Sequence, residues 1–110
     1  MEKYLENTIA RNTLRLVPTL LIDDLEMARA SHMSAVPRYG SHNPFRDLAR
    51  TQALHLIDAA VTLKRDVGKV IGEVAGLTTD PEIKNGIKTA FVEALIVVSF
   101  AAEKSEAQRQ

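Results

Sequence analysis

The chain contains no cysteine and no tryptophan, and it has few other aromatic residues, few prolines and few glycines. The absence of cysteine excludes disulfides and thiolate-bound metals. Aromatic residues make up 5% of the 110 residues, whereas alanine and leucine are plentiful. Because this mixture favours helices over strands, and apolar residues recur at helical spacing, the sequence predicts an all-α protein.

Charge of neither sign is in excess, since fourteen Lys and Arg stand against fourteen Asp and Glu. A protein that holds nucleic acid mainly through its phosphates needs a basic surface, so nucleic acid is not an expected partner. The most apolar stretch, residues 90–102, contains Glu93 and is shorter than the ~20 residues of a membrane-spanning helix. The first residues lack the apolar core of a signal peptide. We expect a cytoplasmic protein that does not contact a membrane.

The length is typical of a single domain, which we expect to span residues 1–110. The predicted fold is a small all-α bundle of three to five helices, with one long amphipathic helix and one central apolar helix. The expected elements are a kinked helix or helix pair over 1–33, a loop over 34–43, the long helix over 44–76, a turn over 77–80, the apolar helix over 81–104, and a polar tail over 105–110.

The first segment has apolar residues at helical spacing, which we expect to line one face. Pro18 interrupts this segment, so it is either one kinked helix or two helices. The acidic residues Asp23, Asp24 and Glu26 are expected to be exposed. The residues expected on the apolar face are Leu5, Ile9, Leu16, Leu20, Leu21, Leu25 and Ala28.

Two pairs of residues predict where helices begin. Asn43 is a favoured N-cap and Pro44 loses no hydrogen bond at the first helical position, so a helix is predicted to begin at Pro44. Thr79 or Asp80 as the N-cap, with Pro81 in the first turn, forms a second start signal of the same kind.

The segment 44–76 carries apolar residues at alternating steps of four and three, which is a heptad seam. Short loops on both sides favour the core of a bundle over a coiled-coil contact with another chain. Gly68, Gly72 and Gly76 fall opposite the seam, where either a second helix packs closely or the helix ends early. The seam residues are Ala49, Ala53, Leu56, Ala60, Leu63, Val67, Val70, Val74 and Leu77.

The last helix is apolar on every side over residues 94–98, so we expect it to be buried all round, centrally or in an oligomer interface. Glu93 within it should pair or reach the surface, because a lone buried carboxylate is costly. The candidate partners are Arg50, Lys64, Arg65 and Lys88.

Arg50 and His55 are the residues with the clearest chemical potential. Histidine moves protons near neutral pH, and arginine stabilises phosphoryl charge. Their spacing resembles the R-x4-6-H signature of the HEPN ribonucleases. The resemblance implies a small helical dimer in which the two side chains meet at the dimer interface and support transphosphorylation of RNA. Thr51 follows Arg50 where that family often has Asn or Asp.

No other motif points to an enzyme, and the three histidines His32, His42 and His55 form no i, i+4 pair of metal ligands. We therefore expect no metal and no cofactor. The first functional hypothesis is a non-catalytic protein that binds another protein: a small bacterial or phage regulator, adaptor or immunity-type inhibitor. The alternative is the HEPN-like ribonuclease with Arg50 and His55 as catalytic residues.

The loop over 34–43 is either the contact surface for the partner, through Arg38, Tyr39 and His42, or a plain connector. Arginine and tyrosine are enriched at binding hot spots, which favours the first interpretation for Arg38 and Tyr39. The apolar helix and the heptad seam predict, in addition, a homodimer.

Overall fold

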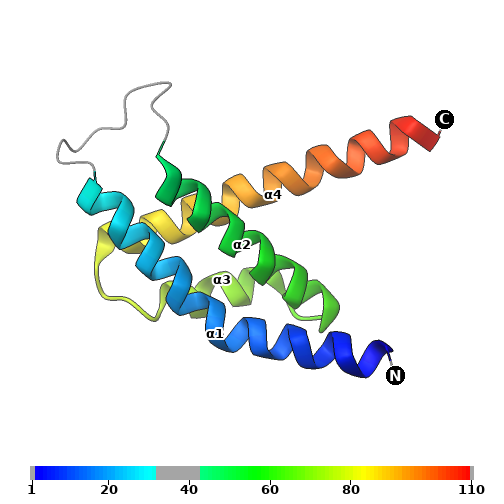
Figure 1. Cartoon of the computed structure of the whole chain (residues 1–110), viewed down its shortest axis with the longest axis horizontal. Helices are drawn as coiled ribbons and strands as arrows, with labels where there is room; N and C mark the ends of the chain where they lie inside the picture. Colours follow the sequence, from blue (N-terminus) through cyan, green and yellow to red (C-terminus); the bar gives the residue numbers. More distant parts are fainter. Residues whose placement is uncertain (1, 32–42, 110) are drawn as a thin grey trace.

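The computed structural model describes residues 2–31 and 43–109, and the side chains of residues 3–31 and 43–99. The described residues form four helices and no strand: α1 (Glu2–Ser31), α2 (Pro44–Thr62), α3 (Val67–Ala75) and α4 (Pro81–Arg109) (Figure 1). The prediction of a small all-α bundle with three to five helices is confirmed. The predicted contact residues Arg38, Tyr39 and His42 lie outside the described residues.

α1 is one helix that continues through Pro18 and bends near its middle (Figure 1). The proline ring has no N–H to donate and crowds the carbonyl four residues earlier, on Leu14, which accounts for a bend at this place. Of the two predicted possibilities, the kinked helix is therefore the one that forms.

α2 begins at Pro44, as predicted, and Asn43 is its N-cap. The Asn43 side-chain oxygen accepts a hydrogen bond from the Phe45 N–H at 2.9 Å. Its amide nitrogen donates to the Ala28 carbonyl and to the Ser31 hydroxyl, both at 3.3 Å. Because Asn43 is buried, this one side chain starts α2 and fastens that start to the end of α1.

The prediction of a single long helix over 44–76 is wrong, because α2 ends at Thr62 and α3 begins at Val67. Lys64 adopts a φ of 56° in the turn, and the Asp66 carboxylate caps α3 by accepting from the Lys69 N–H at 3.3 Å. A straight helix of that length would extend for about 50 Å. The turn instead folds the second half of the seam back onto the bundle.

Most of the predicted seam faces the core. Six of its nine residues are buried, Leu63 and Val67 are half-buried, and Leu77 after α3 is exposed. Among the described residues, no second helix packs on the face opposite the seam, since a Cβ on Gly72 would meet nothing within 4 Å. The glycines therefore mark a short helix that ends at Ala75, not a packing face. The buried seam residues are Ala49, Ala53, Leu56, Ala60, Val70 and Val74.

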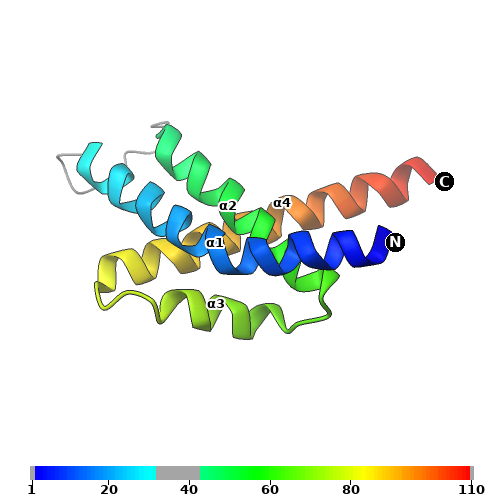
Figure 2. The same ribbon diagram turned by 60° about the horizontal axis from the view of Figure 1, so that its bottom comes forward.

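α4 is central only in its first half, which lies between α2 and α3 in Figure 2. It begins at Pro81 as predicted and continues through Asn85 and Gly86. Of the two predicted ways to bury residues 94–98, the central position is wrong, because Ala94 is buried but the four large residues after it are exposed. The reason is geometric, since the helix extends past the other three helices (Figure 1). Burial in an oligomer interface stays a prediction.

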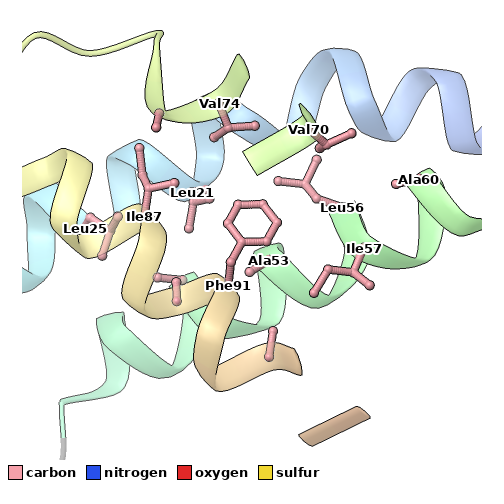
Figure 3. Close-up of a cluster of buried hydrophobic side chains, with 14 of the residues drawn as sticks. Leu21, Leu25, Ala53, Leu56, Ile57, Ala60, Val70, Val74, Ile87 and Phe91 are labelled. Carbon is pink, nitrogen blue, oxygen red and sulfur yellow. The ribbon is translucent and has the colours of Figure 1, made fainter. Parts of the chain in front are cut away.

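The core gathers around Phe91, whose ring lies among side chains from all four helices (Figure 3). Phe91, Leu21, Leu56 and Ile87 are the largest fully buried side chains. Half of the buried hydrophobic positions are alanines, namely Ala10, Ala28, Ala49, Ala53, Ala59, Ala60, Ala75, Ala90 and Ala94. In the part of the chain that the structure describes, no helix has the length and apolarity needed to span a bilayer.

Two glycines in helices should respond to alanine in opposite directions. Gly72→Ala should raise the free energy of unfolding by about 0.5–1 kcal/mol, because alanine favours the helix and the site is open. Gly86→Ala should lower it by about 1 kcal/mol, because the new Cβ would lie 3.1 Å from Leu25 Cδ2, and overpacking outweighs the gain in helix propensity. Urea denaturation measures both values. Equal stabilisation by the two substitutions would contradict the close contact between α1 and α4.

Candidate functional site

Arg50 and His55, the residues of the ribonuclease alternative, are not brought together within one chain. Both lie on α2, and five residues along an α-helix turn a side chain by about 140°. The Arg50 guanidinium lies 3.5 Å from the Asp47 carboxylate on the same helix, whereas His55 is exposed. The geometry of one chain therefore gives no support to a catalytic pair.

The described residues also form no metal site, since no group of three or more His, Asp or Glu among them could hold an ion. Glu93 reaches Arg46 on α2 at 3.7 Å, and both side chains are partly exposed. None of the four candidate partners from the sequence was correct. Glu93 therefore lies beside α2 one helical turn before Arg50, and periodicity along one helix does not reveal where another helix crosses it.

The acidic cluster on α1 divides between two faces. Asp23 and Glu26 are exposed as predicted, whereas Asp24 is half-buried, so its predicted exposure is wrong. Partial burial raises the pKa of the Asp24 carboxyl, the neighbouring charge of Asp23 adds to the rise, and a hydrogen bond with Gln52 of α2 opposes it. One Asp24 oxygen is buried without a hydrogen bond within the described structure. This carboxylate belongs to the packing of α1 on α2.

Arg29, at the end of α1, ties that end to the beginning of α4. Its guanidinium is hydrogen-bonded to the Asp80 carboxylate and lies 3.5 Å from Glu82. Asp80 also caps α4 by accepting from the Glu82 N–H at 2.9 Å and the Ile83 N–H at 3.4 Å. The bond from Arg29, followed by the cap bonds, lowers the pKa of Asp80. The arrangement is a structural clamp.

α1 has a second apolar surface on the side away from the core. The residues predicted to share one face are divided, with Leu21, Leu25 and Ala28 buried and the other four exposed. The four exposed residues are joined by Met27, which is also exposed. Along this set of five, neighbouring residues lie four or seven positions apart, and the pattern repeats every eleven residues, which is about three helical turns. We call this surface the outer stripe: Leu5, Ile9, Leu16, Leu20 and Met27.

The outer stripe is well exposed, with between 47% and 62% of each residue accessible. It spans 22 residue steps, or about 33 Å of helix. Asn12 and Asp23 are exposed and also eleven residues apart, at the polar positions of the same repeat. The eleven-residue spacing was visible in the sequence, but Met27 was missed because periodicity did not separate the two faces.

The second half of α4 presents another exposed apolar surface. Ile87, Phe91 and Ala94 follow one another at steps of four and three and are fully buried, whereas the next position in that register, Val98, is 43% exposed. The apolar face of α4 that packs into the bundle thus continues past the buried part of the helix. We call the exposed group the distal segment: Val92, Leu95, Ile96, Val97 and Val98.

No protein-family model, no curated protein and no solved structure matches the chain. The outer stripe and the distal segment are the two features of the described residues that place several large apolar side chains in solvent without an evident role in folding. They are therefore the candidate functional surfaces.

The clamp between Arg29 and Asp80 predicts a specific pH dependence. Asp80→Asn keeps a cap acceptor but loses the charge, so the variant should unfold at a lower temperature than the wild type at neutral pH. Because the folded-state pKa of Asp80 is lowered, the stabilisation is present above the usual carboxyl pKa of ~3.9 and is lost as the pH falls through the folded-state value. The difference in Tm should therefore shrink in acid.

Circular dichroism melting curves across the acid range measure this difference. Asp58→Asn, at an exposed position on α2, is the control and should show no comparable Tm difference from the wild type at neutral pH. A Tm difference for Asp80→Asn that is equally large in strong acid would show that the lost interaction is not the ionised carboxylate.

Proposed function

We propose that the protein is non-catalytic and works by binding another protein, as a small regulator, adaptor or immunity-type inhibitor. The observation that carries the proposal is the outer stripe of α1, where five large aliphatic side chains stand in solvent along one helix face. Large contiguous apolar patches are unusual on soluble monomers and are often interaction sites. Burial of such side chains contributes roughly 25 cal/mol per Å² of apolar surface.

The shape of the stripe favours a helical partner. Its residues recur at the spacing by which one helix recognises another, as in helix-in-groove complexes. The two polar positions, Asn12 and Asp23, interrupt the stripe at a regular interval. Single polar residues in an apolar helix interface fix register and discriminate between partners. We therefore propose that the occupant is an amphipathic helix of another protein.

We further propose that the chain forms a homodimer through the distal segment of α4. The support is the continuation of the buried stripe of α4 into Val98, which is 43% exposed. Two copies of such a helix can bury each other's apolar surface around a two-fold axis, as isologous interfaces do. Arg38, Tyr39 and His42 stay predicted partner contacts, and Arg50 and His55 have no role in this proposal.

The outer stripe can be tested by affinity capture from the native lysate. Leu16→Glu combined with Leu20→Glu should abolish capture of the partner, because two charges would be buried in the apolar interface. Both positions are exposed, so the variant should keep the helical circular dichroism spectrum of the wild type. Mass spectrometry of the captured proteins measures the loss.

The matched control is Val61→Glu combined with Leu77→Glu, since both residues are at least as exposed as the stripe but lie outside it. This variant should capture the same partner as the wild type. Equal capture by both variants, or no stoichiometric partner for the wild type, would contradict the proposed role of the outer stripe.

The homodimer is tested by sedimentation equilibrium on the purified full chain. Ile96→Glu combined with Val98→Glu should weaken self-association at least about tenfold, because the charges would enter the dimer core. Val61→Glu should leave the association unchanged. A wild type that stays monomeric at about 100 μM, a concentration that reveals even weak dimers, would overturn the dimer. Such a result would leave binding by the outer stripe unaffected.

A further inference from the structure

An open cleft lies between α1 and the turn that follows α2. Its volume is about 440 Å³, and it is lined by Arg11, Leu14, Arg15, Leu63 and Arg65. This volume is within the range of small-molecule sites in proteins. The cleft is separate from the outer stripe and from the distal segment, because none of its lining residues belongs to either surface.

The local fold sets the three arginines around this space. Arg11 and Arg15 are one helical turn apart on α1, with Leu14 between them packed against the core. On the opposite side, α2 ends at Thr62 and the chain reverses through Lys64, which has a φ of 56°. The Arg65 N–H donates to the Ala60 carbonyl at 2.8 Å, so the backbone that carries this guanidinium is fixed to the end of α2.

The charge around the cleft is of one sign. Six arginines have described side chains, and three of them, Arg29, Arg46 and Arg50, are ion-paired with carboxylates. The other three are those that line the cleft. Among the described residues, no ion pair involves them and no carboxylate lines the cleft. In a chain with equal numbers of acidic and basic residues, three arginines therefore line one cleft that no carboxylate of the described residues lines.

We propose that the cleft binds a small molecule with two or more adjacent phosphate groups. The guanidinium group donates two parallel hydrogen bonds to phosphate oxygens, and it stays charged at every physiological pH. Three such groups match the charge of a diphosphate, whereas a single carboxylate would neutralise only one of them. Leu14 and Leu63 are half-buried and offer an apolar surface to the remainder of the ligand. This inference does not rest on the proposed protein-binding function.

Isothermal titration calorimetry of the full chain tests the site, with inorganic pyrophosphate, ADP and AMP as probes at one fixed ionic strength. Pyrophosphate and ADP should bind with a stoichiometry near one per chain, and AMP should bind at least about tenfold more weakly, because it lacks the second phosphate. ADP binding more tightly than pyrophosphate would assign part of the recognition to the leucine surface. Equal binding would assign all of it to the arginines.

The variants separate this site from general attraction of anions to a basic surface. Arg15→Gln and Arg65→Gln should each weaken pyrophosphate binding at least about tenfold. Arg46→Gln and Arg50→Gln remove the same charge at residues whose guanidinium groups are ion-paired elsewhere, and they should leave binding within about twofold. Circular dichroism confirms the fold of each variant.

Three outcomes would overturn the proposal. One is the absence of binding heat for both pyrophosphate and ADP. The second is an equal loss of affinity in all four variants, which would reduce the effect to net charge. The third is a single-stranded RNA that binds more tightly than ADP through the same two arginines, because the cleft would then serve a polyanionic strand and not a small molecule.

Discussion

The packing of this bundle depends on a core that has room for few large side chains. Phe91 fills the space between the four helices, together with Leu21, Leu56 and Ile87. Half of the buried hydrophobic positions are alanines. Small side chains bring helix axes close together, and the space between the helices is correspondingly narrow. Gly86, whose missing Cβ would press on Leu25, shows the same closeness between α1 and α4.

This narrow core explains why so much apolar surface is left outside it. α1 has two apolar faces, and the bundle can cover only one of them, so the side with Leu21 and Leu25 packs inward and the outer stripe faces solvent. α4 is about 44 Å long, close to the longest dimension of the whole molecule, 48 Å. The other helices cover its first half alone. The exposed apolar surfaces are therefore consequences of how the same helices make the core.

The sequence predicted the elements that depend on local chemistry and missed those that depend on which surfaces meet. Asn43–Pro44 and Asp80–Pro81 set helix starts through their own hydrogen bonds, and both starts were found. The break after Thr62 was missed because the turn contains no glycine or proline, and the heptad seam stays apolar across it. Asp66, the cap of α3, was the only local signal. The two faces of α1 share helical spacing, so periodicity could not tell which one is buried.

The arginines show how a chain without net charge can still carry a surface region of strong positive charge. Arg29 and Arg46 join α4 to α1 and to α2 through carboxylates far away in the sequence. Exposed pairs of this kind contribute little to stability, but each one occupies a carboxylate that would otherwise be free to pair with another arginine. The arginines beside the turn after α2 have no such partner in the described structure. Charge balance over the whole chain thus coexists with a local excess of positive charge, and this excess is a property of the fold that composition alone cannot reveal.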